Sequence, residues 1–269
     1  MKMIRFIAFL LLTSLLVSAE DWPKWRGVEG DGRWTGPPIA KELNNHGLAR
    51  VWKVAVNPGY SGVTVQGSRV FVMDRPPVEG GRPTERVLCV DRKSGKKIWE
   101  FVYDAEYKKL DYDKGPRASL TIEDGKAYGL GAMGHAFCVD VKTGQSVWFR
   151  DLRKEENCPF PIWGFSASPE IVGEAVLYHV GGGKSGNLIA LNPQSGKTVW
   201  SVGGDAKAGY AQPILIDIDG VQQLICWGPN KIMGLPMGSG KEFWSIPYEV
   251  KYGVSIAKPI YEEGIVLVC

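Results

Sequence analysis

Along this chain, apolar residues alternate with polar or small ones over short stretches, and glycine or proline interrupts the pattern throughout. Such alternation predicts β-strands with one packed face, as at residues 88–90 and 188–191. Outside the N-terminus we find no long stretch with the apolar spacing of an amphipathic helix. The pattern therefore predicts an all-β protein made of many short strands.

One hairpin pattern occurs four times, at a spacing of about 45–50 residues. In every copy a glycine stands four residues before a tryptophan. The copies are residues 87–99, 136–148, 188–200 and 232–244, with the pairs Gly95/Trp99, Gly144/Trp148, Gly196/Trp200 and Gly240/Trp244. Asp91 and Asp140 predict turns in which the carboxylate accepts backbone N–H groups and the glycine adopts a positive φ. The fourth copy has Pro236 instead and lacks this signal.

A second repeated element precedes each hairpin, at residues 59–74, 115–131, 164–182 and 209–228. It indicates two further short strands, so the full unit has four strands in about 45 residues, the size of one propeller blade. A fifth unit opens at residues 253–269. We therefore predict a β-propeller over residues 59–269, with four full blades of antiparallel strands and a partial one. A two-sheet sandwich would not explain the recurring Gly-x-x-x-Trp.

At these positions the chain resembles the PQQ-like, quinoprotein-type β-propeller family, whose repeats carry the tryptophan-docking motif A-x-D-x-x-T-G-x-x-x-W. The second copy, with Asp140, Thr143, Gly144 and Trp148, matches this motif well. The resemblance implies that the tryptophan of each blade docks on the neighbouring blade, where a large flat ring buries much apolar area. Residues 21–32 also resemble the N-terminal W-x-x-W-R-G segment of secreted bacterial members. The family includes dehydrogenases and outer-membrane assembly scaffolds, so the fold alone does not choose the function.

Residues 1–19 are predicted to be a secretory signal peptide, because a basic start precedes an apolar run and small residues. The apolar run is short for a transmembrane anchor, so we expect no transmembrane segment after cleavage and a periplasmic or secreted location in the cell envelope. Residues 20–58 form an N-terminal segment, in which 48–56 resembles a lone outer strand that would close a ring. Because the resemblance implies a ring of roughly seven or eight blades, we expect the ring to be incomplete in this chain.

Charge and cysteine content narrow the choice of partners. The formal net charge of +3 falls to about +1 without Lys2 and Arg5 of the signal, so charge does not predict binding to nucleic acid or to an anionic membrane. Cys89 and Cys138 occupy equivalent repeat positions and are interpreted as small buried residues. Cys158 and Cys226 could either form a disulfide or remain free thiols, and the sequence leaves both alternatives open. We expect a monomer.

Motifs for catalysis and metal binding are missing from the sequence, so we predict neither catalytic residues nor a metal site. His135 is interpreted as an exposed turn residue and His179 as a half-buried strand residue. The resemblance implies that family members which hold PQQ with calcium carry an adjacent Cys-Cys pair and a carboxylate/Asn set. This sequence has no Cys-Cys, and we can place no calcium set on it. PQQ with calcium is therefore the less favoured alternative to a protein without a cofactor.

The best binding candidates follow from propeller geometry, because inner strands line the central channel and the loops before them build a funnel. The residues expected there are Tyr60, Arg117, Phe165, Ser166, Tyr210 and Gln212. Such residues suit a peptide, a glycan or a small polar ligand, the alternative being that they only fill the channel. Trp163 and Trp227 lie outside the docking register. Each is interpreted either as a platform for a ligand ring or as a core residue. We predict a non-catalytic binding or scaffold propeller with a protein or glycan partner. The alternatives are a PQQ-dependent alcohol or sugar dehydrogenase and an outer-membrane assembly scaffold.

Overall fold

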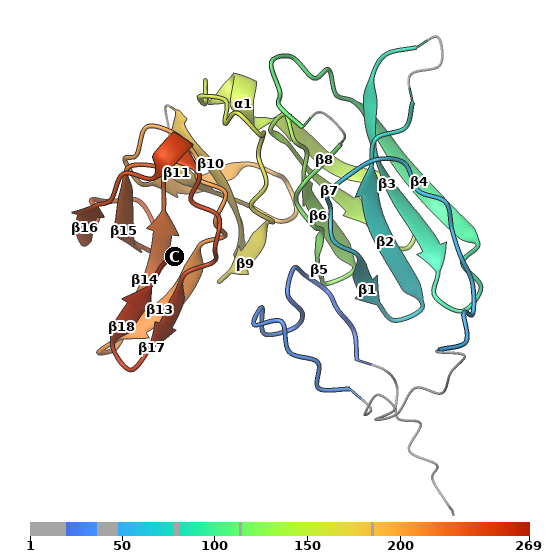
Figure 1. The fold of residues 1–269 in the computed structure, drawn as a ribbon, viewed down its shortest axis with the longest axis horizontal. Helices are drawn as coiled ribbons and strands as arrows, with labels where there is room; N and C mark the ends of the chain where they lie inside the picture. The colour runs from blue at the N-terminus through green and yellow to red at the C-terminus, as the bar shows by residue number, and fades with distance from the viewer. Residues whose placement is uncertain (1–19, 37–47, 78–80, 113–114, 184–185) are drawn as a thin grey trace, which may run out of the picture.

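The computed structural model of the protein describes residues 20–36, 48–77, 81–112, 115–183 and 186–269, and the predicted signal peptide lies outside them. The described residues form four four-stranded antiparallel sheets and one two-stranded sheet, each made of consecutive strands (Figure 1). This confirms the predicted all-β propeller architecture with four full blades and a partial one. The described sheets do not close into a ring.

The first sheet contains β1 (Thr64–Gln66), β2 (Arg69–Asp74), β3 (Thr84–Asp91) and β4 (Lys97–Asp104). The second contains β5 (Thr121–Glu123), β6 (Lys126–Leu130), β7 (His135–Asp140) and β8 (Ser146–Asp151), followed by the short helix α1 (Leu152–Glu155). The third contains β9 (Glu170–Val172), β10 (Ala175–Gly183), β11 (Gly186–Leu191) and β12 (Thr198–Val202). The fourth contains β13 (Ile214–Ile218), β14 (Val221–Trp227), β15 (Lys231–Pro236) and β16 (Trp244–Pro247), followed by the 3-10 helix η1 (Lys251–Gly253). The fifth contains β17 (Ile260–Glu262) and β18 (Ile265–Leu267).

The turn between the third and fourth strands is closed by its own side chains. In the first sheet, the Asp91 carboxylate accepts the N–H groups of Lys93 and Ser94 and the Ser94 hydroxyl. Asp140 makes the corresponding bonds in the second sheet. Gly95 then adopts a φ of 69°, which glycine reaches without the steric cost that a Cβ would add. Because all of these bonds lie within one turn, the local sequence is enough to specify the hairpin.

Tryptophan rings join successive sheets. The Trp99 ring lies over Gly144 of the next sheet, and its Nε1 donates to the Val141 carbonyl oxygen at 3.0 Å. A Cβ at Gly144 would lie 2.6 Å from this ring, so the close approach requires a glycine. Trp148 lies in the same way over Gly196 of the third sheet. These contacts place an indole ring and a hydrogen bond at each of these two junctions.

The residues of the fourth copy are arranged differently. Trp200 packs in the cluster between the third and fourth sheets. Its ring is not within 4 Å of a Cβ built at Gly240, whose nearest neighbour is Pro236 at 3.6 Å. The Trp244 Nε1 donates to the Gln223 side chain of its own sheet at 2.8 Å. The turn that lacks the Asp signal therefore also lacks the ring-on-glycine contact.

Residues 48–56, which resemble a ring-closing strand, pair with none of the described strands, and the expectation that they complete a last blade stays a prediction. Within this segment the Trp52 ring lies over Gly95, and its Nε1 donates to the Arg92 carbonyl oxygen at 2.8 Å. The segment thus contacts the first sheet as Trp99 contacts the second, through its side chain and without sheet pairing.

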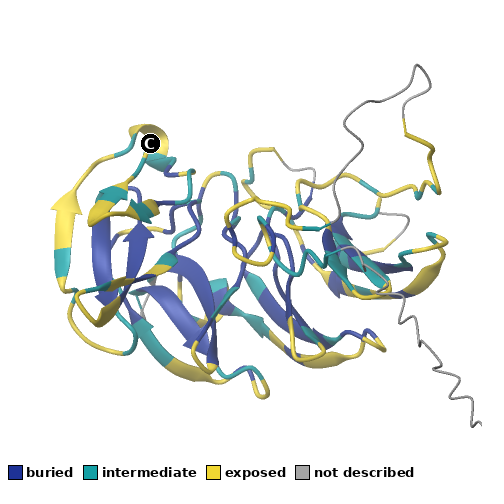
Figure 2. Ribbon diagram, turned by 90° about the horizontal axis from the view of Figure 1, so that it is seen from below, coloured by how far each residue is buried: buried dark blue, intermediate teal, exposed yellow. Residues whose placement is uncertain are grey.

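One apolar cluster fills each interface between adjacent sheets, from the first and second to the fourth and fifth. Figure 2 shows these buried residues on the strands, with exposed residues on outer strands and loops. Cys89 and Cys138 are buried as predicted, and burial raises the pKa of each thiol to about 12. Cys158 and Cys226 are also buried, and no disulfide joins them. No helix in the described ranges is long and apolar enough to cross a bilayer.

Candidate functional site

The segments that lead into the inner strands come together at one place. Tyr60 precedes β1, Arg117 precedes β5 and Tyr210 precedes β13. The Tyr60 N–H donates to the Pro116 carbonyl oxygen at 2.8 Å, which ties the first two segments to each other. Three of the predicted funnel residues therefore gather, although they come from connections to three different sheets.

Two more aromatic residues complete this group. The Trp163 ring centroid lies 5.4 Å from that of Tyr210 and 5.8 Å from that of Tyr112. The backbone N–H of Trp163 also donates to the Tyr210 hydroxyl at 3.1 Å. Tyr60, Tyr112, Arg117 and Trp163 line a cavity of about 280 Å³, which we call the aromatic pocket. From the sequence, Trp163 was either a ring platform or a core residue, and Tyr112 was not among the predicted binding residues.

The Arg117 guanidinium is oriented by main-chain carbonyl groups. It donates to the carbonyl oxygens of Gly115, Asp111 and Tyr112, and its centre lies 5.3 Å from the Tyr60 ring centroid. Burial lowers the pKa of Arg117. The group nevertheless stays charged near neutral pH, because a guanidinium in a protein is effectively always protonated. The pocket therefore combines a fixed positive charge with aromatic faces.

A buried carboxylate is connected to the pocket. Glu85 in β3 is fully buried and accepts the hydroxyl groups of Tyr103 and Tyr107 and the Ala132 N–H. Burial and the Glu85 carboxylate raise the pKa of both tyrosines, so the two hydroxyls remain protonated donors. Arg117 lies 5.9 Å from the Tyr107 ring centroid. The network thus joins the first two sheets and supports the guanidinium of the pocket.

His179 in β10 holds the loop that carries Tyr210. Its Nδ1 contacts the Ala211 carbonyl oxygen at 3.2 Å, and its Nε2 accepts the Gly209 N–H at 3.4 Å and faces the Cys226 thiol at 3.6 Å. These partners fit the neutral tautomer with its proton on Nδ1. Burial lowers the pKa of His179 to about 4. The side chain is 2% exposed, so the expectation of a half-buried residue is corrected to a fully buried one that positions both neighbours of Tyr210.

Of the six predicted funnel residues, only Tyr60 and Arg117 line the aromatic pocket, and Tyr210 lies behind its wall residue Trp163. Phe165 is 1% exposed and packs in the core between the second and third sheets. The Ser166 hydroxyl donates to the Tyr210 carbonyl oxygen at 3.5 Å. Gln212 is 2% exposed, and its amide donates to Glu170. The remaining open candidate, Trp227, is 3% exposed and belongs to the core between the fourth and fifth sheets.

The other histidine within the described ranges, His135, is also more enclosed than expected. It begins β7, its side chain is 14% exposed, and its ring stacks on Phe149 at 5.5 Å, so the exposed-turn interpretation is wrong. Burial lowers the pKa of His135. Among the residues that the structure describes, no group of three or more His, Cys, Asp and Glu side chains could hold a metal ion.

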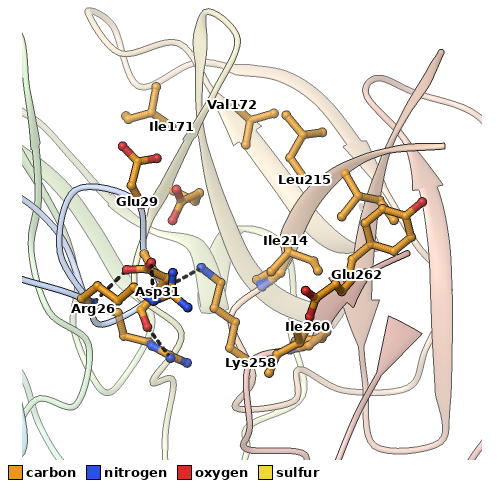
Figure 3. Close-up of a pocket in the computed structure, with 17 residues that line it drawn as sticks. Arg26, Glu29, Asp31, Ile171, Val172, Ile214, Leu215, Lys258, Ile260 and Glu262 are labelled. Atoms are coloured by element: carbon orange, nitrogen blue, oxygen red, sulfur yellow. Dashed lines mark hydrogen bonds and ion pairs between the residues drawn. The ribbon is translucent and has the colours of Figure 1, made fainter. Parts of the chain in front are cut away.

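A second and larger cavity of about 750 Å³ lies between the N-terminal segment and the inner strands (Figure 3). We call it the axial cavity. Its walls are N-terminal residues between Arg26 and Arg33 and residues of, or next to, the strands β9, β13 and β17. Lys258 extends across it and donates to the Gly30 carbonyl oxygen at 3.1 Å. Sequence reasoning did not identify this cavity, because it depends on where the N-terminal segment folds back.

Comparison with known families places this fold among PQQ-like propellers. The family model described as outer membrane protein assembly factor BamB matches residues 41–212. This match covers more than half of the chain, and the protein belongs to this family of PQQ-like repeats. The family assignment confirms the resemblance inferred from the repeats.

Two kinds of relatives are similar to the chain. The quinoprotein alcohol dehydrogenase PedH of Pseudomonas putida is 27% identical over 195 residues, which are 70% of this chain and 29% of that protein. The quinoprotein ethanol dehydrogenase of the same species is 31% identical over 98 residues, 36% of this chain and 15% of that protein. The crystal structure of BamB from Moraxella catarrhalis aligns with a TM-score of 0.51 at 18% identity, over 77% of this chain and 54% of that one. The chain spans less than a third of the length of these curated relatives.

Proposed function

We propose that the protein is a non-catalytic binding or scaffold propeller of the cell envelope, which holds a protein or glycan partner at the aromatic pocket. The observation that supports this most directly is the convergence of Tyr60, Tyr112, Arg117 and Trp163 on one cavity. All four residues lie in connections that precede inner strands and not in the strands themselves. The envelope location is part of the proposal and agrees with the family description.

The chemistry of the aromatic pocket suits a partner with a flat apolar face and a negative or polar group. Tyr and Trp rings offer large contact areas at a small cost in side-chain entropy, and a guanidinium binds carboxylates in a fixed geometry. Tyr60 is 49% exposed and Tyr112 is 66% exposed, so both rings are accessible. Tyr112 also has a φ of 53°, a costly conformation for a non-glycine residue that is enriched at ligand sites. Both a sugar ring and an aromatic peptide side chain meet these requirements.

Calorimetric titration with defined probes tests the proposal. We would titrate the protein with a glucuronic-acid-containing tetrasaccharide and with a blocked Tyr-Asp dipeptide. We expect saturable heat with at least one probe, and a loss of about tenfold or more in affinity for Trp163→Ala, because a ring platform contributes roughly 1–3 kcal/mol. Trp34→Ala is the matched control, since Trp34 is 42% exposed and does not line the pocket. Equal binding by both variants, or no heat from either probe, would reject the aromatic pocket as the site.

A second candidate, a PQQ-dependent oxidoreductase, is favoured by the alignment with PedH over 70% of the chain. The residues present fit this cofactor only in part. The rings of Tyr112 and Trp163 and the Arg117 charge suit a planar polycarboxylate, but the described residues supply no cluster of acidic ligands for a calcium ion. Titration with PQQ, with and without Ca²⁺, distinguishes the candidates, because calcium-dependent binding would favour the oxidoreductase and no binding would leave the partner-binding function.

A further inference from the structure

The inner strands of the five sheets are edge strands, which offer unpaired backbone N–H and C=O groups. The N-terminal segment already uses two of these edges. Trp22 and Val65 of β1 exchange two backbone hydrogen bonds at 2.9 Å, and the Ile122 N–H of β5 donates to the Pro23 carbonyl oxygen at 2.8 Å. The first two sheets therefore bind an extended segment of this same chain through their inner edges.

After Pro23 the N-terminal segment leaves the strand edges. Lys24 forms an ion pair with Glu170 of β9 at 2.6 Å, and residues from Arg26 onward form a loop. This loop is closed on itself by the Arg26 guanidinium, which donates to the Asp31 carbonyl oxygen at 2.8 Å. The loop forms one wall of the axial cavity, while residues of, or next to, β9, β13 and β17 form the others (Figure 3). The inner edge of the fourth sheet thus borders open space where those of the first two carry the N-terminal segment.

Strand β13 is the best pairing edge within this cavity. It is five residues long, whereas β9 and β17 each have three. Ile216 packs toward the fifth sheet together with Tyr261, so the alternation of a strand places Leu215 on the opposite face, toward the third sheet. Leu215 is 40% exposed. A strand added along β13 would place its side chains alternately on these two sides.

The side chains around β13 favour an apolar occupant with polar ends. Ile171 and Val172 line the cavity on the side of the third sheet, and Ile260 lines it on the side of the fifth. Ile260 is 52% exposed, so its side chain can still gain contacts. The charged residues of the cavity are of both signs: Arg26, Arg33, Lys258, Glu29, Asp31, Glu170 and Glu262. This mixture does not select strongly for net charge, so recognition would rest on backbone pairing and apolar contacts.

We propose that the axial cavity binds an extended, uncharged peptide segment as an additional strand along β13, beside the N-terminal segment that already pairs with β1 and β5. This site shares no residue with the aromatic pocket, so it stands independently of the function proposed for that pocket. The volume of about 750 Å³ is that of a site for a short peptide or a comparable ligand.

The test uses a blocked pentapeptide of alternating threonine and valine, acetylated and amidated at its ends. Calorimetry should show saturable binding of this probe. The same peptide with every backbone amide N-methylated should bind about tenfold more weakly or worse, because it keeps the side chains but loses the pairing donors. Hydrogen exchange of the amides at residues 214–218 should slow when the unmodified peptide is present.

Two protein variants complete the test. Leu215→Lys should weaken binding by about tenfold or more, because a lysine on an edge strand opposes strand addition. Val199→Lys is the matched control, since Val199 is 57% exposed on the outer strand β12 and lies outside the cavity. Trp163→Ala should bind the pentapeptide as well as the unaltered protein does. The proposal is overturned if the unmodified probe does not bind, if the N-methylated probe binds equally well, or if exchange slows only outside residues 214–218.

Discussion

Mild acid is expected to destabilise the protein through His179, and His179→Gln is expected to remove much of this sensitivity. The Nε2 atom of His179 accepts the Gly209 N–H and faces the Cys226 thiol, so a proton on Nε2 would point at two donors. Burial lowers the pKa of His179 from 6.5 to about 4. Between these two values the unfolded chain takes up a proton that the folded protein does not. Stability is therefore complete above pH 6.5 and is lost as the pH falls toward 4.

The size of the effect follows from the two pKa values. A difference of one pKa unit corresponds to about 1.4 kcal/mol, so His179 should remove about 2 kcal/mol of unfolding free energy at pH 5 and about 3 kcal/mol by pH 4. Gln has no charged form in this range but can still accept the Gly209 N–H. It would leave the Ala211 carbonyl oxygen without its present donor, at a cost of about 1 kcal/mol that does not depend on pH.

Urea unfolding followed by tryptophan fluorescence at pH 7.5, 6.5, 5.5 and 5.0 measures this difference. The variant should start less stable at pH 7.5 but lose about 2 kcal/mol less than the unaltered protein on going to pH 5. Lys142→Gln, at an exposed turn position, should keep the full pH dependence. The linkage argument is refuted if His179→Gln and the unaltered protein lose stability in parallel over this range.

Two further substitutions test the packing. Gly144→Ala should cost at least about 2 kcal/mol more than Gly125→Ala in urea unfolding, because both glycines have a φ near 70° but only a Cβ at Gly144 would overlap the Trp99 ring. Equal costs would mean that the ring gives way freely. Glu85→Gln should lower the free energy of unfolding by about 1–3 kcal/mol, because an amide nitrogen would face a Tyr103 or Tyr107 hydroxyl that now donates. An unchanged midpoint would show that these hydroxyls find other acceptors.

The repeats predicted the sheets well because their signals are local. Asp91 and Gly95 form their turn with residues a few positions away, so a short stretch of sequence specifies the hairpin and its place in the blade. The same local signal is missing at Pro236, and there the ring-on-glycine contact is absent too. Trp52 could not be assigned in this way, because it stands in a segment without a repeat and its partner Gly95 comes from another element.

The aromatic pocket was predicted only in part, because Tyr112 and Trp163 lie in connections just before the repeated elements that begin at residues 115 and 164. Tyr60 and Arg117 were found from their position before inner strands, but Tyr112 lies in a loop that no periodicity describes. Phe165 stands only one position from Ser166, yet it is 1% exposed in the core while Ser166 bonds to the Tyr210 backbone. A shift of one residue changes which way a side chain points at the start of a strand, and the sequence does not define that start.

This division between repeats and connections separates stability from binding. The residues of the repeated hairpins form the turns, the ring contacts and the clusters between sheets. Substituting them should therefore change the free energy of unfolding and leave the geometry of the connections largely unchanged. Tyr112 and Trp163 are accessible to ligand and contribute little to those clusters. His179 is an exception, because it lies in a strand and yet holds the residues on both sides of Tyr210. A single substitution at His179, as at Glu85, should therefore change stability and the aromatic pocket together.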